Sequence, residues 1–225
     1  MIVGTGLLAS QFDRRGFSSK DVIIFASGVS NSRETRTEEF ERERFLLSSH
    51  LRLQSLPVVY FSSFGVSTGE QSPYLSHKGE MERLVIAASE KNLVFRLPQV
   101  VGRSENPNTL ANALIHKIGN GIAFDVWTKA ERNFIDVEHV VAIVEEFVKQ
   151  GRSGVFPIMC ERSLSMIEIV RIFEAILDKP AKFRLIETGT PMPPETDEIA
   201  SVAQQLGIDL GGDYAARTLR KYYSV

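Results

Sequence analysis

A serine, a tyrosine and a lysine near the middle of the chain have the types and spacing of a proton-transfer site. The segment "YFSSFGVSTGEQSPYLSHKGE" places Ser62 and Ser63 before Tyr74, and Lys78 four residues after Tyr74. Four residues are about one helical turn, so Tyr74 and Lys78 would share one face of a helix. A lysine ammonium beside a phenol is expected to lower the phenol pKa from about 10, which makes the tyrosine usable as an acid or base.

The place of this pair in the expected fold favours catalysis over an ordinary surface pair. The apolar run 57–65 is typical of a strand that ends near the two serines, and 73–90 is typical of the helix that follows. In a parallel sheet covered by helices, ligands bind in the crevice at the carboxyl ends of the strands. The serines would lie at that end, and Tyr74 would begin the helix that faces the same crevice.

The turn "VGTGLLA" near the start of the chain is a second candidate site. Gly4-x-Gly6-x-x-Ala9 follows a short apolar strand and opens a helix, as a dinucleotide-binding turn does. Glycines at these positions let the backbone approach a pyrophosphate, which then lies at the helix N-terminus. A plain tight turn is the alternative, because such glycine patterns recur often.

One part of a dinucleotide site is missing from the sequence. The fold normally places an acidic residue about 20 residues after the glycines, where it holds the adenosine ribose. Here the first helix leads directly into "VIIFASG", which leaves no room for an intervening strand and helix. Arg14 and Arg15 could meet the 2′-phosphate of NADP, but the sequence favours the simpler interpretation that they are the charged end of the first helix.

Apolar runs alternate with helix-period segments along the chain, which predicts a doubly wound parallel sheet, α/β in class. Strands are expected at 1–3, 21–28, 57–65, 93–102, 122–127 and 155–159, with a break at Pro98. Helices are expected at 7–14, 35–53, 73–90, 108–121, 137–151 and 163–177, followed by two short helices in the tail. Thr35 with Glu38, and Ser165 with Glu168, have the spacing of capping boxes.

The pattern divides the chain into two regions. Residues 1–102 are predicted to form a dinucleotide-binding, Rossmann-like core that lacks one early βα unit. Residues 103–225, with more proline and glycine, are predicted to complete that core and to form a small substrate lobe.

Composition argues against nucleic-acid and membrane partners. The net charge is −2, and no apolar run approaches the roughly 20 residues that span a bilayer. The first ten residues lack the basic region of a signal peptide, so a cytoplasmic location is expected. The single cysteine, Cys160, excludes an intramolecular disulfide and zinc sites built on cysteine pairs, and no metal is expected. Its apolar lead-in predicts a buried thiol.

Six segments, in order, resemble the extended short-chain dehydrogenases/reductases, in the NAD-dependent epimerase/dehydratase branch that acts on nucleotide-activated sugars. They are "GTGLLA", "VIIFASGVSNS", "VVYFSSFGV", "SPYLSHKGEMERLV", "FRLPQVVG" and "ERNFIDVEHVVAIVEEFV", and they extend from residue 4 to residue 148. The resemblance implies NAD or NADP as the cofactor and a nucleotide sugar as the substrate. It also implies a homodimer formed through the helix at 35–53 and the helix that carries Tyr74.

The resemblance assigns roles to individual residues. Tyr74 would be the catalytic acid/base, Lys78 would bind the nicotinamide ribose and tune Tyr74, and Ser63 would position the substrate oxygen, with Ser62 as the alternative. Further cofactor contacts would come from Gly4, Gly6, Leu7, Leu8, Ala26, Ser27, Gly28, Pro98 and Val100. Substrate contacts would come from Asn108, Leu110 and Arg132, whose planar guanidinium suits a diphosphate.

The sequence therefore predicts an NAD(P)-dependent oxidoreductase or epimerase of a nucleotide-diphosphate sugar, in surface polysaccharide synthesis. Dehydratases of the family place an acidic pair directly after the serine or threonine, and Phe64 with Gly65 at these positions disfavours 4,6-dehydration. Ser63 and Tyr74 are only 11 residues apart, which implies a trimmed loop and a more open site. Two alternatives stay open: a non-catalytic nucleotide-sensing or scaffold protein, and an NADP-dependent reductase of small carbonyl compounds.

Overall fold

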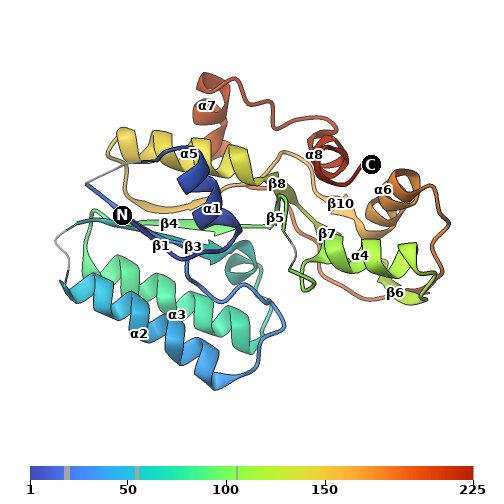
Figure 1. Ribbon diagram of the computed structural model, residues 1–225, viewed down its shortest axis with the longest axis horizontal. Coiled ribbons are helices and arrows are strands. Elements are labelled where there is room, and N and C mark those ends of the chain that lie inside the picture. The colour runs from blue at the N-terminus through green and yellow to red at the C-terminus, as the bar shows by residue number, and fades with distance from the viewer. Residues whose placement is uncertain (18–20, 54–55, 105, 225) are drawn as a thin grey trace.

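A five-stranded parallel sheet forms the centre of the molecule, in the order β1-β2-β3-β4-β9. The structure is a computed structural model that describes residues 1–17, 21–53, 56–104 and 106–224 (Figure 1). The strands of the sheet are β1 (Ile2–Val3), β2 (Ile23–Phe25), β3 (Val58–Ser63), β4 (Leu93–Leu97) and β9 (Gly154–Pro157). Every neighbouring pair runs parallel, as the alternation of strands and helices predicted.

Helices cover both faces of this sheet, so the predicted doubly wound architecture is confirmed. Figure 1 shows α1 (Leu7–Arg14) and α5 (Val137–Lys149) on one face, and α2 (Thr37–Leu53) and α3 (Pro73–Ala88) on the other. The strands β2, β3 and β4 are buried along almost their whole length. Because strands covered on both faces need apolar residues on both faces, they appear in sequence as continuous β-branched and aromatic runs.

Strand β1 lies at the edge of the sheet and pairs directly with β2, with Ile2 opposite Ile24 and Val3 opposite Phe25. In a Rossmann sheet, whose strand order is 3-2-1-4-5-6, the first strand lies inside the sheet, so the edge position of β1 confirms that an early βα unit is missing. The helix after β1 covers one face, whereas the helix after β2 covers the other. Neighbouring strands whose connections leave toward opposite faces have a crevice at their carboxyl ends, where ligands bind in such sheets.

The second half of the chain adds three small two-stranded sheets. β5 (Gln99–Val101) pairs with β8 (Phe134–Asp136), β6 (Phe124–Trp127) with β11 (Phe183–Ile186), and β7 (Glu131–Arg132) with β10 (Leu164–Ser165). Only β5 and β6 fall within predicted strands. The break at Pro98, between β4 and β5, is confirmed. The other strands are two to four residues long, too short to show a two-residue hydrophobic period.

The remaining helices are the short 3₁₀ turn η1 (Phe64–Ser67), α4 (Leu110–Gly119), α6 (Met166–Leu177), α7 (Asp197–Gln205) and α8 (Tyr214–Tyr223). The capping box at Ser165 and Glu168 is present at the start of α6. The one expected at Thr35 and Glu38 is wrong, since α2 begins at Thr37. The backbone N–H of Thr35 instead donates to Glu34 Oε1, at 3.1 Å.

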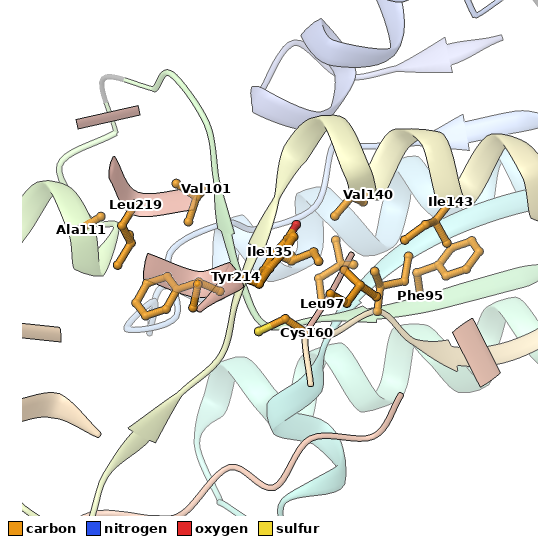
Figure 2. Packing of buried hydrophobic residues seen from close by; sticks show 14 of the residues in the cluster. Phe95, Leu97, Val101, Ala111, Ile135, Val140, Ile143, Cys160, Tyr214 and Leu219 are labelled. Carbon is orange, nitrogen blue, oxygen red and sulfur yellow. The ribbon is translucent and has the colours of Figure 1, made fainter. Parts of the chain in front are cut away.

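One continuous hydrophobic core joins the sheet to the C-terminal helices. Figure 2 shows Phe95 from β4, Ile143 from α5 and Leu219 from α8 as parts of one cluster of buried residues. Cys160 lies in the same cluster, and burial raises the pKa of its thiol. It is therefore the unreactive core thiol that the sequence predicted. Within the described ranges, none of the helices has the length and apolar character needed to cross a membrane.

Candidate active site

A cavity of about 520 Å³ opens at the carboxyl ends of the central strands. Its wall is built from the β1–α1 turn, the β2–α2 loop, the end of β3, the first turns of α3, the end of β4 with β5, and the segment before α4. The structure brings twelve of the residues singled out from sequence together on this wall: Gly6, Leu7, Leu8, Ala26, Ser27, Gly28, Ser63, Tyr74, Lys78, Pro98, Val100 and Asn108. Segments separated by a hundred residues thus contribute to one cavity.

Three other residues singled out from sequence lie behind or beside this wall. Gly4 has φ +125°, and a Cβ there would lie 2.4 Å from the carbonyl oxygen of Ala26, so glycine is needed for the β1–α1 turn to pack against β2. Leu110 begins α4 and packs against the hydrophobic core. Arg132 lies on β7, half-buried, and donates from Nη1 to the carbonyl oxygen of Glu131 at 2.6 Å.

The N-terminus of α1 faces the cavity through a glycine. The N-cap residue is Gly6, which has no side chain to accept the first N–H groups of the helix. A Cβ at Gly6 would meet nothing within 4 Å, so the space beside it is open.

The structure supports the simpler interpretation of the two arginines at the other end of α1, that they are the charged end of this helix. Arg14 donates to Gln11 at 2.9 Å, and Arg15 pairs with Glu145 on α5 at 2.7 Å.

The cap of α3 sets the position of Tyr74. Ser72 is the N-cap and accepts from the N–H of Leu75 at 3.1 Å, and Pro73 occupies the first position, where its missing N–H costs nothing. Tyr74 therefore lies in the first helical turn and lines the same cavity as Ser63. Ser63 Oγ accepts from the N–H of Gly65 at 3.3 Å.

The two serines at the end of β3 have different surroundings. Ser63 is half-buried and accepts from the N–H of Gly65, whereas Ser62 is buried and its Oγ has no hydrogen-bond partner among the described residues. Both line the cavity. A buried hydroxyl without a partner costs free energy, so the Ser62 hydroxyl is suited to a polar group of a bound ligand.

Lys78 is held at the floor of the cavity by Glu43 and Tyr60. Its Nζ lies 3.0 Å from Glu43 Oε1 and 3.0 Å from the Tyr60 hydroxyl, and 5.9 Å from the centroid of the Tyr74 ring. Only 2% of the Lys78 surface and 0% of the Glu43 surface are exposed. The lysine is therefore part of a buried ion pair.

This ion pair changes the electrostatics that the sequence predicted. Burial raises the pKa of Tyr74, and the Glu43 carboxylate raises it further, while the hydrogen bond with Ser63 lowers it. The expectation that Lys78 lowers the Tyr74 pKa is wrong for this structure. The reason is that the negative charge of Glu43, in contact with Lys78, offsets the effect of the Lys78 charge on the Tyr74 phenol. Tyr74 is therefore protonated at neutral pH.

Comparison with known proteins supports the resemblance seen in the motifs. The matched segment runs from residue 61 to residue 158 and contains Ser63, Tyr74 and Lys78. It matches the NAD dependent epimerase/dehydratase family. The resemblance to this family is thereby confirmed. No curated protein matches the chain.

Solved structures of epimerases and reductases share the fold. The UDP-glucuronic acid 4-epimerase from Bacillus cereus, in complex with UDP-glucuronic acid and NAD, has a TM-score of 0.72 at 15% identity, over 96% of this chain and 77% of that one. The UDP-N-acetylglucosamine 4-epimerase from Methanobrevibacter ruminantium, in complex with UDP-N-acetylmuramic acid, has a TM-score of 0.72 at 14% identity, over 93% and 77%. RMD from Pseudomonas aeruginosa, complexed with NADPH, has a TM-score of 0.67 at 14% identity, over 100% and 99%. At these identities the likeness shows the fold alone.

The motifs of the epimerase/dehydratase family did not indicate several residues of the cavity and its floor. Glu43 and Tyr60 hold Lys78 from below, and Arg42 lines the cavity and donates to the carbonyl oxygen of Ser27 at 3.3 Å. In sequence, Glu43 belongs to the charged run "EEFERERF", which is typical of a solvated helix face. One signal was available: Glu43 is four residues before Leu47, and both lie on the buried face of α2.

Proposed function

We propose that this protein is an NAD(P)-dependent oxidoreductase or epimerase that acts on a nucleotide-diphosphate sugar, in the cytoplasm and in surface polysaccharide synthesis. One observation carries the proposal: a single cavity gathers the glycine turn of β1–α1, Ser63, Tyr74 and Lys78. No single motif has this weight, because each one recurs in proteins without the activity.

The residues of the cavity fit a nicotinamide dinucleotide. The open space at Gly6 and the α1 N-terminus suit a pyrophosphate, and Ala26, Ser27 and Gly28 would pass beneath the cofactor. Pro98 and Val100 would approach the nicotinamide, which when bound supplies or accepts the hydride. The similar solved structures hold NAD in one case and NADPH in another, which supports either cofactor.

Ser63 and Tyr74 would carry the proton chemistry. The Ser63 hydroxyl would hold the oxygen of the reacting sugar carbon by a hydrogen bond. As that carbon gains a hydride, Tyr74 would give its hydroxyl proton to the oxygen, and as the carbon loses a hydride Tyr74 would take the proton back. The raised pKa of Tyr74 supports the first direction, because the phenol then carries its proton at neutral pH.

The substrate would be held mainly by residues 103–225, and the cofactor by residues 1–102. Asn108 lines the cavity, and Leu110 begins the helix beside it. Arg132 donates to a backbone carbonyl, and this contact does not neutralise the guanidinium charge. A bound diphosphate would supply a neutralising negative charge. Phe64 and Gly65 offer no acid for dehydration, which supports epimerisation or reduction at the sugar C4.

Ligand-dependent stabilisation tests this proposal. Thermal unfolding would be followed with NADH and with NADPH, each alone and together with UDP-, GDP- or dTDP-sugars. We expect one dinucleotide to raise the Tm, by an amount that grows with its concentration, and turnover of one sugar class. Stabilisation without turnover of any sugar would favour the nucleotide-sensing alternative, and no stabilisation by any of these ligands would contradict the proposal.

Substitution of Gly6 by alanine separates cofactor binding from folding. The new Cβ enters the open space beside the α1 N-terminus, where the pyrophosphate would lie, and meets no protein atom within 4 Å. We therefore expect G6A to weaken dinucleotide binding about tenfold or more, with little change in Tm. Calorimetric titration and thermal unfolding would measure the two effects.

Gly4 is the matched comparison for Gly6. In G4A the Cβ would collide with the Ala26 carbonyl and the residue would keep a positive φ, so we expect a lower Tm as the main effect. Equal losses of stability in G6A and G4A would contradict a ligand-binding role for Gly6.

We further propose that α2 and α3 form a homodimer interface, as the resemblance implies. On the surface of these two helices, Phe45 has 76% and Ile86 has 40% of its area exposed. A hollow of about 630 Å³ lies between α2 and α3. We expect Phe45→Asp to shift the protein from dimer to monomer in analytical ultracentrifugation, because a charge would be buried at the interface. Leu185→Asp, at an exposed apolar position on β11, is the control and should keep the dimer. A monomeric wild-type protein would exclude the interface.

A further inference from the structure

Glu43 is a buried carboxylate that lies behind the cavity wall and contacts Lys78, which lines the cavity. It projects from α2 and accepts hydrogen bonds from four groups on three other segments. The Tyr60 hydroxyl donates to Oε1 at 2.6 Å, and Lys78 Nζ donates to the same oxygen at 3.0 Å. The N–H of Val29 donates to Oε2 at 2.6 Å, and His77 Nε2 lies 3.1 Å from Oε2. The carboxylate thus ties the β2–α2 loop, β3 and α3 together beneath the cavity.

The histidine in this cluster faces Glu43 through one ring nitrogen. Because a carboxylate accepts, His77 Nε2 must carry the hydrogen that faces Glu43. Its Nδ1 is buried with no hydrogen-bond partner among the described residues, and the ring stacks on Phe40 with 4.7 Å between the ring centroids. The Lys78 ammonium, 3.0 Å from Oε1, is the cation that balances the Glu43 charge.

The contacts keep Glu43 ionised in spite of its burial. Burial alone would raise the pKa of this carboxyl, but the charge of Lys78 and the hydrogen bonds from His77, Tyr60 and Val29 hold the pKa at about 2. Burial lowers the pKa of Lys78, and Glu43 opposes that effect. The other charged or titratable groups that act on Lys78 or Glu43 are Arg42, Tyr74 and Glu82.

We propose that Glu43 is a positioning residue of this site, one that fixes the Lys78 ammonium on the cavity floor and keeps it charged. The proposal rests on the function proposed above for Ser63, Tyr74 and Lys78. The geometry supports it, because the Glu43 carboxylate contacts Lys78 Nζ directly and both groups are buried. The Tyr60 hydroxyl contacts both groups and so holds them in place relative to each other. Glu43 itself lies behind the cavity wall and does not touch the ligand space.

Removing the charge of Glu43 leaves a buried cation without its partner. In Glu43→Gln, Lys78 would remain between Tyr60 and Tyr74 with no carboxylate in contact. An uncompensated buried cation is strongly unfavourable, so the Tyr74–Lys78 pair would release its first proton at a lower pH than in the wild type. Glu43→Asp keeps the charge and should restore the wild-type pH behaviour in part.

The first experiment compares pH profiles of turnover. In E43Q we expect kcat to fall about tenfold or more and the alkaline limb of the kcat/KM profile to move about one pH unit or more toward neutrality, with a smaller change in KM for the sugar. E174Q is the matched control, since Glu174 on α6 is also a carboxylate that accepts from a backbone N–H, that of Ala181, but lies far from Lys78 in the chain. A wild-type profile in E43Q would overturn the proposal.

The second experiment needs no activity. In E43Q the folded-state pKa of Lys78 falls further below its unfolded value of about 10.4 than in the wild type, because Glu43 no longer opposes the effect of burial. Between the folded and unfolded values the unfolded chain binds more protons, so the stability of E43Q rises with pH over a wider range than that of the wild type. The Tm deficit of E43Q relative to the wild type should therefore shrink as the pH is raised from 6 to 9. In E43Q/K78M, which buries neither charge, the pH dependence of this deficit should disappear. A deficit that is equal at both pH values would overturn the ion-pair role.

The two experiments separate the failure of this inference from the failure of the proposed function. If no dinucleotide or sugar is bound or turned over, but the Tm deficit of E43Q still shrinks with pH, the proposed function fails and the ion pair stands. If the wild type turns over a sugar and neither pH effect appears in E43Q, the positioning role fails and the proposed function stands.

Discussion

Replacing Tyr74 by phenylalanine is expected to lower kcat about 10²- to 10⁴-fold, with the fold and dinucleotide binding retained. The change removes only the hydroxyl of a residue that lines the cavity, the group that would carry the transferred proton. The raised pKa of this phenol means that the wild-type group is protonated, so the variant loses a proton donor rather than a charge. Steady-state kinetics and the dinucleotide Kd would be measured on the same preparations.

Tyr223→Phe is the control for this substitution. Tyr223 lies at the end of α8, where its ring packs against Phe173 with 5.7 Å between the centroids. It loses the same hydroxyl, and we expect its kinetics to match the wild type. If Y74F keeps more than about a tenth of the wild-type kcat, Tyr74 is not the acid/base, and the Ser62 hydroxyl becomes the group to test.

Replacing Gly28 by alanine is expected to damage both activity and stability. A Cβ at this position would lie 2.6 Å from Lys78 Nζ and 2.9 Å from Glu43 Oε1, closer than Cβ atoms approach other groups. Gly28 has no positive φ, so the backbone alone would accept alanine. Because both neighbours are buried and held by further hydrogen bonds, Lys78 must move. We expect a loss of about 1–3 kcal/mol in the free energy of unfolding and at least a tenfold lower kcat.

Gly79→Ala is the matched control for G28A, one residue after Lys78 on α3. Its Cβ would make ordinary contacts, 3.6 Å to Val66 and 3.7 Å to Arg83. Alanine within a helix is favoured over glycine by up to about 1 kcal/mol, so we expect unchanged or higher stability and retained activity. Denaturant titration and kcat would be measured for both variants. If G28A behaved like G79A, the ion pair on the cavity floor would not constrain the site.

The elements that show a clear hydrophobic pattern within their own residues could be predicted from sequence, and the shortest ones could not. The helix that carries Val140 is amphipathic, and the buried strands β2, β3 and β4 appear as continuous apolar runs. The strands β7, β8, β10 and β11 exist only because a partner strand from a distant segment lies beside them. The same contrast explains the two capping boxes: Ser165 caps α6 as its spacing predicts, whereas the pairing of Glu34 with Arg36 organises the residues before α2 instead.

By itself the sequence determined the local parts of the site, since their rules act over a few residues. The spacing of Gly4 and Gly6, the four-residue spacing of Tyr74 and Lys78 and the apolar run before Ser63 need no distant partner to be interpreted. Tertiary contacts were needed to show that Lys78 is paired with Glu43, 35 residues away in the chain. Burial, and after it the charge of Glu43, raises the pKa of Tyr74. Electrostatics depends on which charges lie close in space and how deeply they are buried, and folding sets both.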